Sequence, residues 1–482
     1  MIPRRAVTIG TSLWIGAAVA GCVHGAPGAV APAAPPAPAA AAPAPAATAL
    51  EGAWLGTLDL GVTGELRLVL KIRREGSALT ATFDSIDQHA PDIPIDTVAF
   101  DGSALTLSSS RIQASFEAHL VGDTLSGTFR QRGAEFPLAL TKTANPPTVT
   151  ARPQQPARPL PYDELELFVD GPSHNRLACT LTKPRGSGPF GAVVLITGSG
   201  PQNRDEAIAG HRPFLVLADA ITRRGIAVLR CDDRGVGGSA GVFATATTFD
   251  FADDALAELA ALRARSDVDP ARVGLVGHSE GAIIAPIAAV RSTDVKFVVL
   301  LAPPAVPGDQ TLHLQSAAIL KANGASDVQI AAAKAVNRDA FAIVAAEPNA
   351  AVAAEKLRAR FATLPKATRD TLEQQNKQLT SPWFRTFLSL DPRDFLRKLR
   401  VPLLAVFGER DVQVLLDPNL QELRRALHDN RDVTVRQFPG LNHLFQTCTT
   451  GLPDEYARID ETMSPAALTL VTDWLAARAT GK

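Results

Sequence analysis

Between residues 50 and 143, apolar and polar residues alternate with a period near two. In 65–72, leucine and isoleucine side chains fall on one face and mostly charged side chains on the other, which predicts half-buried β-strands. Similar segments begin at Gly76, Gly102 and Gly122 and indicate one hairpin unit that repeats. We therefore expect an antiparallel β domain over 50–143, either a small barrel or a sandwich.

From about residue 162 to 482, the pattern changes to alternating strands and helices. Continuous apolar, β-branched runs are typical of strands buried on both faces of a parallel sheet. They occur at 192–197, 227–230, 273–276, 295–301 and 403–407. Amphipathic segments separate them, as where Phe251, Ala255, Leu259 and Leu262 recur at helical spacing. These segments predict an open, mostly parallel α/β sheet.

Three further segments differ in composition from these two domains. Residues 23–49 are dominated by alanine and proline, which favours an extended tether without a core. Residues 144–161 are rich in proline and predict a linker before the domain at 162–482. The alanine-rich stretch at about 305–391 has a helical pattern and is too long for a plain connection. It predicts a helical cap inserted into the α/β domain.

The first 22 residues have the pattern of an export signal. Arg4 and Arg5 precede an apolar segment, 6–20, that is too short to span a bilayer comfortably. The segment ends in Val19-Ala20-Gly21-Cys22, which resembles the bacterial lipobox. That resemblance implies lipid attachment at Cys22, and Val23 after it implies sorting to the outer membrane, facing the periplasm. The alternative is an ordinary secretory signal that contains a cysteine.

Length and charge restrict the remaining classes of function. With 482 residues, the chain is too long for one core, so two or more domains are expected. A formal net charge of -1 provides no electrostatic footprint for nucleic acid. No cluster of metal ligands and no phosphate loop occurs in the sequence, so no metal and no cofactor are expected.

Three cysteines remain after removal of the signal, namely Cys179, Cys231 and Cys448. An odd number cannot pair completely within one chain. Cys179 and Cys231 lie in apolar, strand-like runs, so we expect buried free thiols and predict no disulfide.

The sequence Gly277-His278-Ser279-Glu280-Gly281 has the Gly-x-Ser-x-Gly form of a nucleophile elbow. An apolar strand at 273–276 precedes it, and an apolar segment of helical length at 282–290 follows it. A serine hydroxyl becomes a useful nucleophile when it is held on a tight strand-to-helix turn, near a base and backbone N–H donors. Ser279 is therefore the candidate nucleophile.

In folds with this elbow, the acid and then the histidine follow the serine along the chain. His443 comes after the predicted strand 433–438 and its turn, at the edge of the sheet where such sites lie. The alternative, His428, falls in an amphipathic helix and is expected at the surface. His443 is therefore the candidate base.

Three carboxylates follow the strand 403–407, namely Glu409, Asp411 and Asp417. Asp411 stands four residues past the strand, on the turn before the next helix. Asp417 precedes a proline and has the pattern of a helix start, and Glu409 is expected to be solvated. We therefore choose Asp411 as the acid that orients the histidine.

The oxyanion hole should combine two backbone N–H groups. One belongs to Glu280, the residue after the nucleophile. The other is expected from the glycine-rich loop that follows the strand 192–197, from Ser199 or, as second choice, Gly198.

Five ordered motifs, at 198–205, 232–239, 277–281, 408–414 and 442–446, resemble one bacterial group. This group comprises α/β-hydrolase carboxylesterases with a small N-terminal β domain. The resemblance covers about 50–482 and implies an acyl hydrolase with Ser279, Asp411 and His443 as its triad. Cys231 departs from the pattern, which leads us to expect an aromatic residue there. Asp233 and Arg234 are expected to form a structural ion pair.

The sequence thus predicts a serine carboxylic ester hydrolase of small to medium acyl esters, exported and tethered to the cell envelope. Alternatives with the same chemistry are a thioesterase, an acyltransferase or a peptidase. A prolyl-peptidase relative would carry a β-propeller, for which 50–143 has too few residues. An inert cell-surface binding protein is the alternative from a different class.

The predicted lipid anchor can be tested by growing cells with labelled palmitate. We expect label on the protein and its loss in Cys22→Ala, because the lipid needs that thiol. An unlabelled protein, or label that persists in the variant, would contradict the prediction.

Overall fold

The computed structural model describes residues 50–59, 65–76, 78–86, 90–109, 112, 114–131, 134–148, 152–172 and 175–480. The predicted signal, the tether and Cys22 lie outside these residues. The chain divides into two compact units. One unit extends to Arg152 and includes 208–211, and the other contains 153–207 and the chain from Arg212 onward.

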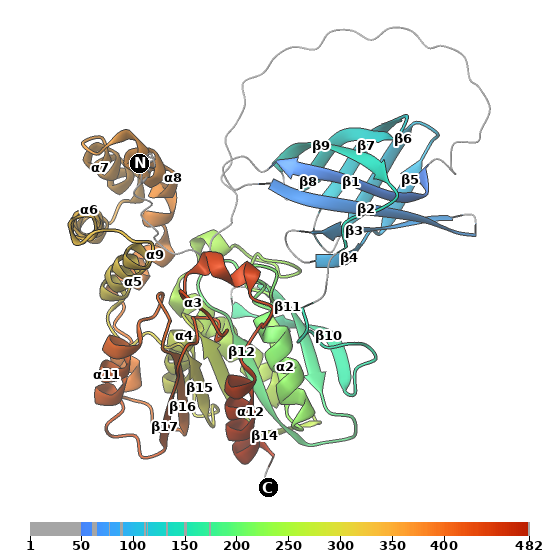
Figure 1. Cartoon of the computed structure of the whole chain (residues 1–482). Coiled ribbons are helices and arrows are strands. Elements are labelled where there is room, and N and C mark those ends of the chain that lie inside the picture. The colour runs from blue at the N-terminus through green and yellow to red at the C-terminus, as the bar shows by residue number, and fades with distance from the viewer. Residues whose placement is uncertain are drawn as a thin grey trace, which may run out of the picture. The chain divides into compact units, whose positions relative to one another are not determined.

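The first unit consists of nine strands in one antiparallel sheet (Figure 1). The strands are β1 (Gly52–Asp59), β2 (Glu65–Glu75), β3 (Ala78–Ser85), β4 (Ala90–Pro94), β5 (Thr97–Phe100), β6 (Ala104–Ser109), β7 (Ala114–Val121), β8 (Thr124–Gln131) and β9 (Ala134–Thr143). Their order is β4-β3-β2-β1-β9-β8-β7-β6-β5. Only Ile95 and Asp96 join β4 to β5, the two end strands. The sheet must therefore curl until its ends meet, which makes it barrel-like rather than a sandwich.

Large apolar side chains fill the inside of this curled sheet. Trp54, Leu70 and Phe116 are almost fully buried, and the rings of Phe83 and Phe129 meet edge to face with centroids 6.2 Å apart. The described residues of this unit thus form a packed core.

The second unit is built on an eight-stranded sheet with the order β10-β11-β13-β12-β14-β15-β16-β17. The strands are β10 (Asp163–Asp170), β11 (Arg176–Lys183), β12 (Phe190–Ile196), β13 (Ala227–Cys231), β14 (Val268–His278), β15 (Val298–Leu301), β16 (Leu403–Gly408) and β17 (Val433–Phe438). Across the sheet, the six strands β13, β12, β14, β15, β16 and β17 are parallel to their neighbours in this order. Strand β11 is antiparallel to both of its neighbours, β10 and β13. The predicted, mostly parallel α/β sheet is confirmed.

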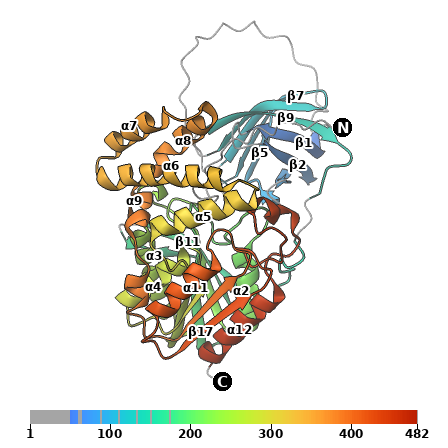
Figure 2. The same cartoon turned by 60° about the vertical axis from the view of Figure 1, so that its left-hand side comes forward.

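Helices cover both faces of this sheet (Figure 2). One face packs against α3 (Thr248–Arg263), α4 (Gly281–Arg291) and α11 (Leu416–Ala426). The other packs against α2 (Pro213–Arg223) and α12 (Pro465–Ala479). The predicted helical stripe is present in α3, where Ala255, Leu259 and Leu262 are buried.

A helical cap lies between β15 and β16 in the chain, as the sequence predicted. It comprises α5 (Gly308–Ala322), α6 (Asp327–Ala346), α7 (Ala350–Phe361), α8 (Lys366–Leu379) and α9 (Pro382–Ser389), and the short α10 (Arg393–Leu396) follows. Short 3₁₀ helices occur at Phe243–Thr245 and Pro453–Arg458. Within the described residues, no helix combines the length and apolar character needed to cross a bilayer.

The expectation of free thiols at Cys179 and Cys231 is wrong, because the two residues form a disulfide. They stand directly opposite each other on the antiparallel neighbours β11 and β13, with Cα atoms 4.0 Å apart. The sequence did not reveal that these two strands are adjacent. The disulfide also accounts for a cysteine at 231, where an aromatic residue was expected.

We expect non-reducing digestion to yield one peptide that joins Cys179 to Cys231. Replacing both by alanine should lower the free energy of unfolding by about 2–4 kcal/mol, because the bond closes a loop in the unfolded chain. Chemical denaturation would measure the change, with Cys448→Ala as the control for a cysteine that is free in the structure. Alkylation of both thiols in denaturant without reductant would exclude the bond.

Candidate active site

Ser279 lies on a tight turn between β14 and α4, at the carboxyl edge of the sheet. Its φ of 55° is in the left-handed region that non-glycine residues seldom adopt. The Ser279 N–H donates to the carbonyl of Leu301 at 2.9 Å, which ties the turn to β15. The serine is half-buried, and this geometry is that of a nucleophile elbow.

The two glycines of the elbow are required by close backbone packing. A Cβ on Gly277 would lie 2.0 Å from the carbonyl oxygen of Gly281. A Cβ on Gly281 would lie 2.1 Å from the carbonyl oxygen of Ile196, at the end of β12. Any side chain at either position would push α4 away from the sheet.

The structure brings the predicted base and acid together. His443 Nδ1 lies 2.7 Å from Asp411 Oδ2, and both side chains are buried. The other carboxylate oxygen of Asp411 accepts the N–H groups of Gln413 and Val414, both at 2.8 Å. This arrangement fixes the aspartate, which in turn orients the imidazole.

The alternative candidates for the acid and the base do not take part in this pair. Glu409 is exposed and accepts the N–H of Gly440 at 2.9 Å. Asp417 lies in the first turn of α11, as its pattern predicted. His428 is at the surface, with its side chain 69% exposed.

The two candidates for the second oxyanion donor can be distinguished. The Gly198 N–H donates to Glu206 Oε1 at 2.8 Å and is therefore already used. Among the described residues, no acceptor takes the N–H of Ser199. A Cβ placed on Gly198 would be 3.2 Å from the Cβ of Ser279, so this loop lies directly against the candidate nucleophile. This geometry favours Ser199.

The elbow, the buried acid–base pair and the glycine-rich loop converge at the carboxyl edge of a mostly parallel sheet. A family model described as serine aminopeptidase S33 matches residues 212–447, a range that includes Ser279, Asp411 and His443. The chain has the α/β-hydrolase fold.

Similar proteins include esterases. The chain is 30% identical over 288 residues to esterase EstD of Thermotoga maritima, which covers 59% of this chain and 61% of that relative. The chain thus spans less than two thirds of the relative's length. A structure of a Pyrococcus furiosus esterase is 15% identical, covering 66% of this chain and 91% of its own, with a TM-score of 0.42. Est1E of Butyrivibrio proteoclasticus with bound ferulic acid is 16% identical, covering 64% and 96%, with a TM-score of 0.38.

His278, the residue before the candidate nucleophile, links the segment that carries Glu206 to the loop that carries His443. Its Nε2 donates to the carbonyl oxygen of His443 at 3.0 Å, and its Nδ1 lies 2.8 Å from Glu206 Oε1. Burial lowers the pKa of His278, but the charge and hydrogen bond of Glu206 outweigh this, and the net pKa is raised. The two histidine rings lie 4.7 Å apart, which places His443 beside the elbow.

The sequence showed His278 within the elbow motif but did not indicate its role. No motif pointed to Glu206. Its carboxylate accepts the Gly198 N–H and also pairs with His278. It therefore joins the glycine-rich loop at 198–205, called the oxyanion loop below, to β14, the strand that leads to Ser279.

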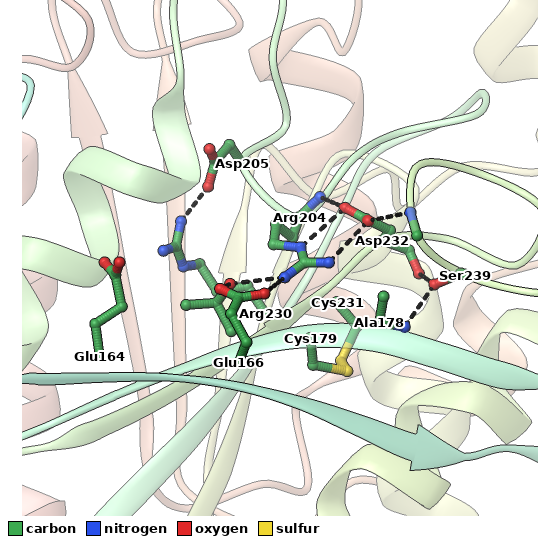
Figure 3. Close-up of polar contacts among 12 residues, drawn as sticks. Glu164, Glu166, Ala178, Cys179, Arg204, Asp205, Arg230, Cys231, Asp232 and Ser239 are labelled. Carbon is green, nitrogen blue, oxygen red and sulfur yellow. Dashed lines mark hydrogen bonds and ion pairs between the residues drawn. A yellow bond between two sulfur atoms is a disulfide. The ribbon is translucent and has the colours of Figure 1, made fainter. Parts of the chain in front are cut away.

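An ion pair clamps the oxyanion loop to the end of β13 (Figure 3). Arg204 donates through Nε and Nη2 to the two oxygens of Asp232 at 3.1 and 2.9 Å. The Ser239 hydroxyl donates to the carbonyl of Asp232 at 2.7 Å and accepts the N–H of Ala178 at 2.8 Å. The clamp therefore reaches β11 next to the disulfide of Cys179.

The expected ion pair between Asp233 and Arg234 is not formed. Arg234 donates instead to both oxygens of Asp254 on α3, at 2.7 and 2.8 Å. Asp233 accepts the Thr197 hydroxyl at 3.0 Å and the Gln202 N–H at 2.8 Å. Adjacent side chains at a strand end point in different directions, so sequence neighbours serve separate partners.

A cavity of about 30 Å³ is lined by Gly198 and Gly200 of the glycine-rich loop and by the carboxyl-bearing residues Asp233, Glu258 and Glu280, among others. Burial raises the pKa of both Asp233 and Glu258 well above their usual range, and each also feels neighbouring carboxylates. Glu258 is 8% exposed. Within the described residues, no group of histidine, cysteine, aspartate or glutamate side chains is suited to hold a metal ion.

Glu258→Gln tests the burial of this carboxyl. Unfolded Glu258 ionises near its ordinary pKa of 4.5, whereas the raised folded pKa keeps the native side chain protonated to higher pH. Unfolding therefore releases a proton above pH 4.5, and the free energy of unfolding falls as pH rises.

Glutamine does not ionise, so we expect Glu258→Gln to remove this fall in the free energy of unfolding. Urea denaturation should therefore show a larger gain in stability over wild type at about pH 8 than at about pH 5. Glu355→Gln, at an exposed position on α7, should show no such difference. An equal effect of Glu258→Gln at both pH values would mean that the folded carboxyl ionises normally.

Proposed function

We propose that the protein is a serine carboxylesterase that forms an acyl-enzyme on Ser279. The observation that carries this proposal is the buried hydrogen bond of 2.7 Å between His443 Nδ1 and Asp411. The His443 ring lies 4.7 Å from the ring of His278, the residue before the strained elbow serine. A strained serine near an oriented histidine is suited to nucleophilic catalysis.

In the proposed first step, Ser279 Oγ attacks the ester carbonyl carbon while His443 Nε2 takes the hydroxyl proton. The carbonyl oxygen becomes an oxyanion that accepts the N–H groups of Glu280 and Ser199. Collapse of the tetrahedral intermediate breaks the bond to the alkoxy oxygen, which leaves as alcohol with the proton from His443. Asp411 stabilises the imidazolium between these events.

In the second step, His443 removes a proton from water, whose oxygen attacks the acyl-enzyme. The same two N–H groups hold the second oxyanion. Its collapse releases the carboxylic acid and returns the proton to Ser279. Each N–H donor of this kind typically lowers the barrier by about 3 kcal/mol.

The choice of an ester substrate rests on the similarity to esterase EstD and on the five motifs of the sequence. Small to medium acyl esters are proposed because a helical cap accompanies the site. The aminopeptidase description of the matching family supports a second candidate, a peptidase that uses the same residues on an amide. Thioester hydrolysis and acyl transfer differ only in the leaving group or the acceptor.

We further propose that the enzyme is exported and held at the outer membrane, facing the periplasm, by lipid on Cys22. This rests on the tetrad that ends in Cys22 and on the alanine- and proline-rich stretch that follows it. Several acyl chains would anchor firmly, since each buried methylene contributes about 0.8 kcal/mol.

The proposed function is tested by labelling with a fluorophosphonate and by hydrolysis of p-nitrophenyl esters of increasing chain length. Wild type should label at Ser279. Ser279→Ala should take no label and lose at least about 10⁴-fold in kcat, because the nucleophile is absent. Ser292→Ala, at the far end of α4, is the matched control and should behave as wild type.

An inert domain would leave wild type unlabelled, which would contradict the proposal. Labelling with faster turnover of a p-nitroanilide than of the matching ester would favour the peptidase. Faster turnover of the matching thioester would favour a thioesterase.

A further inference from the structure

The side chain of Glu280 joins three separate parts of the α/β unit. Its Oε1 accepts the Thr248 hydroxyl from the start of α3 at 2.7 Å and Trp383 Nε1 from the cap helix α9 at 2.8 Å. The Ser199 side chain, on the glycine-rich loop after β12, also lies near enough to this carboxylate to lower its pKa. The residue is only 2% exposed, so these bonds form away from bulk water.

The backbones of Glu280 and Ser199 are also the two proposed oxyanion donors. The carboxylate of Glu280 thus belongs to one of these residues and lies near the other. A change in its position would move the donors relative to the developing oxyanion, and such donors act only within a narrow range of distance. Thr248 and Trp383 are the side chains that orient the carboxylate from outside this pair.

Trp383 is the cap's contribution to this network. Its indole ring stacks on Phe387 with centroids 5.3 Å apart and lies 6.1 Å from the ring of Phe384, which is fully buried. The ring is thus fixed within α9 by packing, and its N–H is directed at Glu280. Packing of the ring and donation by the N–H can be separated by mutation.

We propose that the cap positions the oxyanion hole through the Trp383–Glu280 hydrogen bond, so that Trp383 is a positioning residue for catalysis. The cap then serves the chemical step as well as covering the substrate. The inference rests on the proposed esterase function. It predicts an effect on kcat, because the oxyanion donors act on the transition state more than on the bound ester.

Trp383→Phe keeps an aromatic ring for the stack and removes the N–H. We expect kcat for a p-nitrophenyl ester to fall by roughly tenfold while KM changes less than about twofold. The inhibition constant of an alkyl trifluoromethyl ketone, which forms a tetrahedral adduct on the serine, should rise by the same factor. Inhibition by the product carboxylic acid should not change.

Two controls separate this role from general packing. Trp474→Phe makes the same substitution on α12, where the indole N–H donates to Thr434 at 3.4 Å, and should leave kcat unchanged. Phe387→Leu removes the stacking partner but keeps the Trp383 N–H, so it should affect kcat less than Trp383→Phe does.

Thr248→Val removes the other hydrogen bond to the same oxygen of Glu280. It should also lower kcat rather than raise KM. It remains informative if Trp383→Phe fails to fold, which thermal denaturation would reveal. The double variant should lose less than the product of the single losses, because both side chains act through one carboxylate.

Wild-type kcat in Trp383→Phe and Thr248→Val, or a rise in KM alone, would overturn the inference while the esterase stands. If wild type itself neither labels nor hydrolyses esters, the proposed function fails and the inference fails with it. Parallel losses in kcat and in affinity for the ketone would support it.

Discussion

The close approach of α4 to the end of β12 is the constraint on which the active site depends. Glycines at 277 and 281 allow backbone contacts that no side chain could tolerate, since a Cβ would come within 2.0 to 2.1 Å of a carbonyl oxygen. This approach places Ser279 in the left-handed region at the edge of the sheet. It also brings Glu280 beside the glycine-rich loop, so the proposed nucleophile and the proposed oxyanion donors come from one turn and its neighbour.

Around this turn, buried charges decide which loops are held together. Asp232 and Asp254 are each neutralised by an arginine, while Glu206 is paired with His278. These pairs link the oxyanion loop, the end of β13, α3 and the loop of His443. Because a buried charge that loses its partner costs several kcal/mol, each pair restricts the positions of the loops around the candidate site.

Asp233 and Glu258 are different, since burial favours their protonated forms. Glu280 is likewise buried with a raised pKa, and its hydrogen bonds with Thr248 and Trp383, together with the nearby Ser199 side chain, offset part of that effect. Around the proposed oxyanion hole, burial therefore disfavours the ionised forms of these three carboxyl groups. Trp383 of α9 reaches this region by its hydrogen bond to Glu280, and this connects the helices between β15 and β16 with the proposed catalytic residues.

Much of the architecture could be predicted because it depends on periodicity. Alternation over 50–143 indicated antiparallel strands, and continuous apolar runs indicated a buried parallel sheet, since each pattern reflects which faces of a strand meet water. The elbow could be identified because its glycines and serine are adjacent in the chain. Chain order then selected His443 and Asp411, which the structure places 2.7 Å apart.

The sequence by itself therefore determined the strands and helices, the elbow and the order of the candidate triad, because these depend on local pattern. Only the tertiary structure decided the rest. It paired Cys179 with Cys231, joined Arg234 to Asp254 instead of Asp233, and paired the Gly198 N–H with Glu206, which favours Ser199 as the second proposed oxyanion donor. These partners are distant in the chain, and strand order and register determine which of them meet.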